Sequence, residues 1–275
     1  MGDRSFDRSH LHRWLTGAVA VPLLALVIGL GPGWLLLLVI MLVASGAMLE
    51  LFPLVLAGTT ARFRVAALSV ALILPLATYW EGVLGLTSAT AAMLFIFLFA
   101  HLFLYTKHEA ALPSLGAVVF TQLYIPYLLS HLILLLQLPS GRRWIFFVLF
   151  VIFAGDTGAY YVGHRWGKLK LWPAVSPGKT VEGAVGGLCT SLVVALIVGK
   201  LLLSPSGVGL SFLLILAFAL ALVGQMGDLM ESMLKRLSQV KDAGGILPGH
   251  GGLLDRLDSL IFAFPLTFYS VALFA

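Results

Sequence analysis

Charged residues are scarce in this sequence. Asp, Glu, Lys and Arg make up only 11% of the 275 residues, whereas 60% are hydrophobic and the mean hydropathy is +1.04. A soluble globular domain usually has about a quarter of its residues charged and about half apolar, so this composition excludes an ordinary soluble domain. It indicates an integral membrane protein.

Cysteine is nearly absent as well. The single cysteine, Cys189, lies in an apolar run, which excludes an intramolecular disulfide but says little about the compartment. The sequence also lacks internal repeats, low-complexity tracts and any stretch polar enough for a separate soluble domain. Its apolar runs are continuous and do not alternate with polar residues, so we expect helices rather than a β-barrel to cross the membrane.

Long apolar runs recur along almost the whole chain. About 20 helical residues cover the hydrocarbon layer of a membrane. The first run resembles a signal peptide but has no clear small-x-small cleavage site, so we expect it to be retained. The sequence therefore predicts an all-α fold, a polytopic membrane helix bundle of about nine transmembrane helices. Their approximate bounds are 14–30, 34–57, 65–80, 83–105, 111–138, 144–163, 181–203, 209–232 and 254–275. The helix over 111–138 is long enough to tilt or to break at Pro126.

Basic residues predict the orientation of this bundle. With a cytoplasmic N-terminus and nine helices, every Lys and Arg except Arg142, Arg143 and Lys200 falls on the cytoplasmic side. Cytoplasmic loops of membrane proteins collect Lys and Arg, so the N-terminus is expected to be cytoplasmic. The same rule places two polar loops, 164–180 and 233–256, on the face that meets soluble metabolites.

Acidic residues concentrate in the second half of the chain. Seven of the twelve are Asp156, Glu182, Asp228, Glu231, Asp242, Asp255 and Asp258. We therefore expect one membrane domain, residues 1–275, in which residues 1–140 supply scaffold helices and residues 141–275 form the catalytic half.

Several polar residues share one face of the helix predicted over 209–232 and its extension. At spacings of i, i+3, i+4 and i+7 stand Asp228, Glu231, Ser232 and Lys235. Ionisable groups within a membrane segment are costly and usually mark a functional site, although an interhelical ion pair that only stabilises the bundle is the alternative. Carboxylate oxygens are suitable ligands for Mg²⁺. Asp255 and Asp258, three residues apart at the start of the helix predicted over 254–275, also share one helix face. We predict that Asp228, Asp255 and Asp258 bind a metal ion.

The segment KDAGGILPGHGGLLDRLDSL, residues 241–260, contains five glycines, one lysine, one arginine and one histidine. Glycine allows main-chain N–H groups to approach an anion closely. The bases Lys235, Arg236, Lys241 and Arg256 could hold phosphates, or they could simply follow the positive-inside rule. His250 could bind a phosphate or orient a carboxylate, and it could equally be an interfacial residue without chemistry.

The segment AGDTGAYYVGHRWGKLKLWPAVSPGKTVEG, residues 154–183, also suggests phosphate binding. Its GKT tripeptide, which ends at Thr180, is not a Walker A motif, because Pro173 stands where that motif requires glycine. Ser176, Lys179 and Thr180 could still bind a phosphate at the N-terminus of the following helix. An ordinary helix N-cap at Thr180 is the alternative.

These motifs together resemble the signature of phosphatidate cytidylyltransferases, also called CDP-diacylglycerol synthases. The longest pattern is Ser232-x2-Lys235-Arg236-x4-Lys241-Asp242-x-Gly244-x3-Pro248-x-His250-Gly251-Gly252-x2-Asp255-Arg256-x-Asp258. The stretches Asp156-Thr-Gly-Ala-Tyr160 and Ser176-Pro-Gly-Lys179-Thr180-x-Glu182-Gly183 resemble a second patch of that family. The resemblance covers the C-terminal half, and it departs from the family at Gly178, where many members have lysine.

The resemblance implies that CTP and phosphatidic acid react to give CDP-diacylglycerol and pyrophosphate. It also implies Mg²⁺, a second cation and a homodimer. From the distribution of basic residues we expect the active site to face the cytoplasm, and we expect a bacterial inner membrane as the location and no nucleic acid as a partner. The catalytic residues would be Asp228, Asp255, Lys235 and Lys241. The substrate-binding residues would be Ser176, Lys179, Thr180, Ser232, Arg236, His250 and Arg256.

Two other functional classes fit some of the same features. Ion-coupled transporters also use intramembrane acids and glycine-broken helices, but this chain lacks a paired half and concentrates its charge at one end. A related membrane enzyme, such as a CDP-archaeol synthase or a polyprenol kinase, would use a different lipid.

Overall fold

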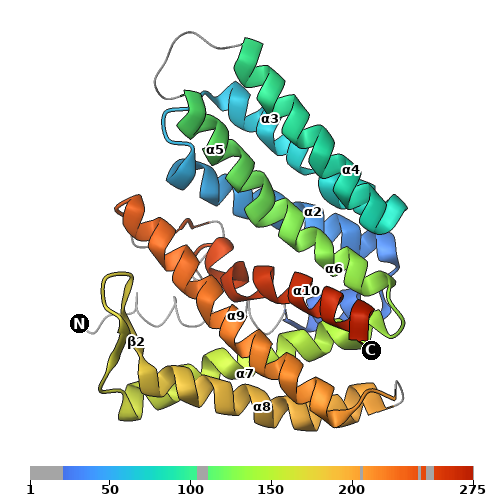
Figure 1. Ribbon diagram of the computed structural model, residues 1–275, viewed down its shortest axis with the longest axis vertical. Coiled ribbons are helices and arrows are strands. Elements are labelled where there is room, and N and C mark those ends of the chain that lie inside the picture. Colours follow the sequence, from blue (N-terminus) through green and yellow to red (C-terminus); the bar gives the residue numbers. More distant parts are fainter. Residues whose placement is uncertain (1–20, 104–110, 205–206, 241–242, 246–250, 275) are drawn as a thin grey trace, which may run out of the picture. The chain divides into compact units, whose positions relative to one another are not determined.

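The computed structural model describes residues 21–103, 111–204, 207–240, 243–245 and 251–274 (Figure 1). Helices make up nearly all of this part. After an apolar helix at Val21–Leu30 come α2 (Gly33–Val55), α3 (Ala61–Ala71), α4 (Ile73–Phe103), α5 (Ala111–Gln122), the π-helical turn η1 (Leu123–Tyr127), α6 (Leu128–Gln137), α7 (Gly141–Trp166), β1 (Lys170–Trp172), β2 (Ser176–Thr180), α8 (Val181–Leu203), α9 (Leu210–Leu237) and α10 (Leu254–Phe274).

The described residues contain seven helical stretches that are long and apolar enough to cross a membrane. They are Gly33–Val55, Ala61–Phe103, Leu112–Gln137, Gly141–Trp166, Val181–Leu203, Leu210–Leu237 and Leu254–Phe274. This confirms the predicted all-α membrane fold.

The number seven differs from the nine predicted helices at two places. The helices expected over 65–80 and 83–105 are counted together in the stretch Ala61–Phe103, but two helices meet within it at a kink at Gly82, between the two predicted helices. Gly82 bends this stretch with φ 59° and ψ −135°, a conformation that glycine adopts because it has no Cβ. Of the helix expected over 14–30, only the part from residue 21 onward lies among the described residues.

Pro126 alters a helix without ending it. Proline has no N–H group and its ring disturbs the preceding turn of an α-helix. Here the chain forms the π-helical turn η1 around Pro126, and α6 continues directly after it. The structure therefore shows a widened turn at the position where the sequence suggested a tilt or a break.

The chain forms two compact units. The first consists of Met1–Tyr127 and Val240–Asp255, and the second of Leu128–Gln239 and Arg256–Ala275. The first two residues of α10, Leu254 and Asp255, therefore belong to the first unit, and the rest of the helix belongs to the second. The predicted division of roles between residues 1–140 and 141–275 stays a prediction.

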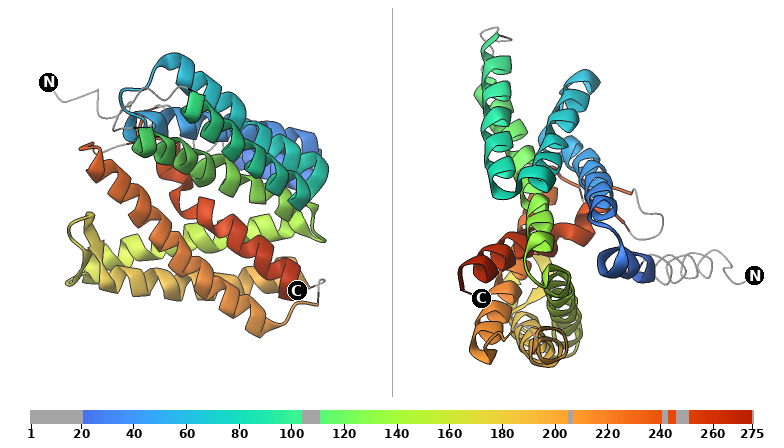
Figure 2. Two further views of the ribbon diagram at one scale, coloured as in Figure 1. Left: turned by 45° about the horizontal axis from the view of Figure 1, so that its top comes forward. Right: turned by 90° about the vertical axis from the view of Figure 1, so that its right-hand side faces the viewer.

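In the second unit, α7 and α8 lie antiparallel, side by side (Figures 1 and 2). Their interface consists of small residues, which allow two membrane helices to approach closely. A Cβ atom at Gly158 would collide with the Thr190 side chain, and Gly163 lies next to the Cα atom of Gly183. The Ser191 hydroxyl donates a hydrogen bond to the Val151 carbonyl oxygen (2.9 Å), which links the two helices.

The loop predicted over 164–180 contains an antiparallel hairpin of β1 and β2, which pairs Lys170 with Thr180 and Trp172 with Ser176. The Glu182 carboxylate accepts hydrogen bonds from the backbone N–H groups of Lys168 (3.0 Å) and Leu169 (3.2 Å). These contacts hold the start of the hairpin against the first turn of α8.

Candidate active site

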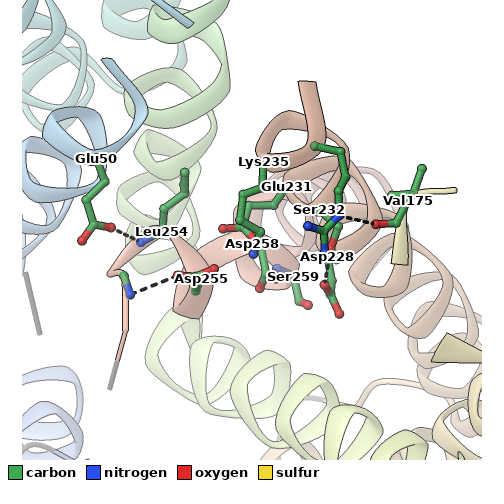
Figure 3. A network of polar contacts seen from close by, with 12 residues as sticks. Glu50, Val175, Asp228, Glu231, Ser232, Lys235, Leu254, Asp255, Asp258 and Ser259 are labelled. Atoms are coloured by element: carbon green, nitrogen blue, oxygen red, sulfur yellow. Dashed lines mark hydrogen bonds and ion pairs between the residues drawn. The ribbon is translucent and has the colours of Figure 1, made fainter. Parts of the chain in front are cut away.

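Three carboxylates gather where α9 and α10 meet in the second unit. Asp228 and Glu231 on α9 and Asp258 on α10 each offer an oxygen, and these oxygens lie within 4.8 Å of one another (Figure 3). The helices approach closely because α9 has Gly227 at this point, where a Cβ atom would overlap the carbonyl oxygen of Asp258. We call Asp228, Glu231 and Asp258 the acidic cluster.

Two members of the acidic cluster are shielded from solvent, whereas the Asp228 side chain is 35% exposed, and the cluster contacts two lysines. Glu231 is 1% exposed and Asp258 is 9% exposed. The Lys235 ammonium lies 2.7 Å from Glu231 Oε2, one helical turn along α9, and the Lys179 ammonium lies 2.5 Å from Asp228 Oδ2. Lys179 comes from β2, so this ion pair joins the hairpin to α9.

Only oxygen donors make up the acidic cluster, and this donor chemistry fits a hard divalent cation. Mg²⁺ is usually held by one or two carboxylates together with water and substrate phosphates. The spacing of the three carboxylates would allow them to share one ion. The i+3 spacing from Asp228 correctly predicts that Glu231 shares its helix face, but Glu231 was not among the predicted metal ligands.

Asp255 was predicted as a third metal ligand, and the structure gives it another contact. Its Oδ2 atom accepts a hydrogen bond from the backbone N–H of Gly252 (3.0 Å) at the start of α10. Among the described residues, the group with metal-binding geometry contains Glu231 and does not contain Asp255. Metal binding by Asp255 therefore stays a prediction.

A cavity of about 580 Å³ opens beside Asp228. It lies within the second unit, between α7, the hairpin, α8 and α9. Its polar lining includes Asp156, Tyr160, His164, Lys170, Ser176, Lys179, Thr180, Gln225 and Asp228. The cavity thus contains three of the predicted substrate-binding residues together with one carboxylate of the acidic cluster.

Thr180 also caps α8. Its Oγ1 atom accepts a hydrogen bond from the backbone N–H of Gly183 (3.1 Å), as expected for an ordinary N-cap. Because Thr180 lines the cavity as well, its predicted contact with substrate stays open. Gln225 is a cavity residue that the sequence did not single out, and its Nε2 atom donates to the Ala184 carbonyl oxygen (3.1 Å).

The remaining predicted residues fall in different places. The Ser232 hydroxyl lies 3.5 Å from Asp228 Oδ1, and the Arg236 Nε atom donates to the Val175 carbonyl oxygen of the hairpin (3.3 Å; Figure 3). Arg256 is exposed in the first turn of α10. Lys241 and His250 lie outside the described residues.

Sequence comparisons extend beyond the motifs to most of the chain. The phosphatidate cytidylyltransferase of Bacillus subtilis (strain 168) is 42% identical over 186 residues, which cover 66% of this chain and 68% of that protein. Phosphatidate cytidylyltransferases of Staphylococcus saprophyticus and Staphylococcus aureus (strain COL) are 50% and 47% identical over 127 residues. These two alignments span 48%, about half, of the staphylococcal proteins and 46% of this chain.

A family-wide comparison gives the broadest match. Residues 11–274 match the sequence model of the Cytidylyltransferase family, so the match includes both the helices that precede the cavity and those that carry the acidic cluster. A polar cavity that combines lysines with carboxylates is what transfer of a nucleotide would require of such a membrane protein. On this evidence, the chain belongs to the cytidylyltransferase family.

Proposed function

We propose that this protein is a phosphatidate cytidylyltransferase. It transfers the cytidylyl group of CTP to phosphatidic acid, and the products are CDP-diacylglycerol, for phospholipid biosynthesis, and pyrophosphate. The observation that carries the proposal is the cavity next to the acidic cluster, in an integral membrane protein of the cytidylyltransferase family. Such a site can receive a soluble nucleotide while the lipid substrate stays in the bilayer.

The reaction is an in-line displacement at phosphorus. An oxygen of the phosphatidate phosphate forms a bond to the α-phosphorus of CTP, and the bond from that phosphorus to the pyrophosphate oxygen breaks. A phosphate monoester is already anionic at neutral pH, so the protein does not need a strong general base. Catalysis then depends on positioning the two substrates and on stabilising the charge that develops.

Mg²⁺ and a second cation are part of this proposal. Asp228 and Asp258, together with Asp255 as the sequence predicts or with Glu231 as the spacing of the acidic cluster favours, would hold them. Bound there, such cations would neutralise the negative charge that develops on the phosphates.

The bases of the chain would hold the phosphates. Lys179 lies in the cavity beside Asp228, where it can donate to a phosphate oxygen, and Ser176 and Thr180 line the same wall. Lys235 and Ser232 lie on the adjoining face of α9. On the basis of the sequence pattern, we propose that the triphosphate or the lipid phosphate is also bound by Arg236, Lys241, His250 and Arg256.

The cellular setting is inferred from the same pattern. The distribution of Lys and Arg supports an active site that faces the cytoplasm. The bacterial sources of the relatives support the inner membrane as its location. We further propose that the working enzyme is a homodimer, which cross-linking of the purified protein in lipid can test.

Pyrophosphate release by the purified protein tests the reaction. We expect release with CTP, phosphatidic acid and Mg²⁺ together, and none in excess EDTA. Asp228→Asn should lower turnover on the order of 10²-fold or more, because metal catalysis contributes several kcal/mol. Glu81→Gln, which changes an exposed carboxylate of α4, is the matched control and should leave turnover unchanged.

The lipid substrate distinguishes the alternatives. Full activity in EDTA, or equal turnover with diacylglycerol in place of phosphatidic acid, would contradict the proposed reaction. Preference for an archaeol phosphate or a polyprenol would indicate the related lipid enzymes. A transporter would release no pyrophosphate with any lipid.

A further inference from the structure

Glu50 is a buried carboxylate in a helix that otherwise resembles scaffold. It lies in the last two turns of α2 and is only 3% exposed, among apolar neighbours such as Leu51 and Phe52. A buried charged group is costly unless it is hydrogen-bonded or paired. Glu50 belongs to none of the motifs recognised in the sequence, so its contacts need a separate explanation.

The Glu50 carboxylate contacts the beginning of α10. Its Oε2 atom accepts a hydrogen bond from the backbone N–H of Leu254, the first residue of that helix, at 2.9 Å (Figure 3). The first N–H groups of a helix have no acceptor within the helix, and the helix dipole favours a negative charge near them. Glu50 thus acts as a cap supplied by a residue that lies 204 positions before Leu254 in the chain.

Two glycines allow the chain to reach this carboxylate. A Cβ atom at Gly244 would overlap the Glu50 side chain, and one at Gly252 would lie 2.9 Å from Glu50 Oε2. Asp255 binds the same turn, because its Oδ2 atom accepts from the N–H of Gly252 (3.0 Å). Two of the glycines in residues 241–260, Gly244 and Gly252, are therefore explained by the close approach of the backbone to Glu50.

We propose that Glu50 is a positioning residue for the cytidylyl transfer. Its carboxylate fixes the first turn of α10 and the backbone at Gly244 and Gly252, so that α10 starts at one defined place. Asp258 of the acidic cluster follows Leu254 by one helical turn along α10. The effect on turnover rests on the proposed function, whereas the effect on the segment itself does not.

A cysteine placed in this segment can report its order without any reaction. Ala243 is 7% exposed, so Ala243→Cys should react slowly with a maleimide. The native Cys189 is exposed and is first replaced in Cys189→Ser. Labelling rates are then compared for the parent, Glu50→Ala, Glu50→Gln and the control Glu81→Ala, which removes an exposed carboxylate of α4.

We expect Glu50→Ala to accelerate labelling on the order of tenfold, because a buried N–H loses its acceptor and the segment opens more often. Glu50→Gln should restore most of the protection, since its amide oxygen can accept the same hydrogen bond. Kinetics are measured in proteins that keep the native Ala243. The kcat for pyrophosphate release should fall about tenfold in Glu50→Ala with little change in the KM for CTP, and Glu50→Gln should recover most of the lost kcat.

The proposal would be overturned if the labelling rate and the kcat of Glu50→Ala both lay within about twofold of the values for Glu81→Ala. Loss of the cap must change both quantities. Equal damage from Glu50→Gln and Glu50→Ala would also overturn it, since the hydrogen bond would then not be the cause. A parent protein without CTP-dependent activity would contradict the proposed function instead, and the labelling rates would still decide the role of Glu50.

Discussion

Asp255 is the residue for which sequence and structure suggest different roles. The sequence pattern predicts a metal ligand, whereas the structure shows a hydrogen bond from the N–H of Gly252 to its carboxylate. Asparagine keeps the size and the acceptor oxygen of aspartate but removes the charge. The substitution Asp255→Asn therefore separates the two roles.

If Asp255 binds metal, Asp255→Asn should lower turnover on the order of 10²-fold or more while the protein still folds and inserts. The measurement is turnover across a Mg²⁺ titration, with Asp255→Ala as the comparison that also removes the hydrogen bond. If Asp255→Asn instead keeps near wild-type turnover at ordinary Mg²⁺ and only Asp255→Ala is defective, Asp255 does not bind metal. Its role would then be to hold the turn at Gly252.

The sequence predicted single residues best where a helical spacing linked them. Asp228, Glu231 and Lys235 share one face of α9 as the i, i+3, i+7 pattern indicates, and Lys235 pairs with Glu231. Glu50 could not be found in this way, because it is an isolated acid whose partner, Leu254, is a distant backbone group. No local pattern encodes such a contact.

At the scale of elements, α7 and α8 are held together by small residues, and this gives a direct test. Gly158→Ala should destabilise the protein by about 1–3 kcal/mol, because the added Cβ would collide with Thr190. Gly116→Ala in α5 makes the same chemical change where nothing lies within 4 Å, and it should be neutral or stabilise by about 0.4–1 kcal/mol.

Thermal unfolding of both variants in the same detergent, followed by circular dichroism, measures the difference. A lower midpoint for Gly158→Ala than for Gly116→Ala is the expected result. Equal midpoints would mean that α7 and α8 can separate slightly without loss, and that close approach of these two helices does not stabilise the fold.

Elements were predictable where a long apolar run determined them. The predicted helices over 144–163 and 181–203 agree with α7 and α8 within a few residues. The prediction for 209–232 ended too early, because α9 continues through the polar residues to Leu237, where Lys235 and Arg236 interact favourably with the dipole of the last turn. The hairpin of β1 and β2 was missed since its strands are only three and five residues long.

At the scale of the whole molecule, the distribution of basic residues predicts a topology that remains to be measured. An odd number of membrane crossings places the N-terminus and the C-terminus on opposite sides, with the N-terminus in the cytoplasm. Fusions of a compartment-sensitive reporter at residue 2 and after residue 275 should therefore give opposite signals. If both reporters indicate the same side, the nine-helix topology is wrong.

The sequence predicted the membrane class and the family resemblance of the whole molecule, because both depend on composition and on linear motifs. It did not predict that the chain forms two compact units, one of which includes residues 240–255 together with the N-terminal helices. That grouping depends on contacts between distant segments, such as the one between Glu50 and Leu254. Linear patterns carry no information about such pairs.

The ion pair between Lys179 and Asp228 has a thermodynamic consequence for how ligands enter the cavity. An anion that attracts the Lys179 ammonium and a cation that attracts the Asp228 carboxylate both compete with the same bond. Once one of them has broken the pair, the other no longer has to do so. We therefore expect the proposed binding of the two ions to be cooperative, with each raising the affinity for the other by the same factor.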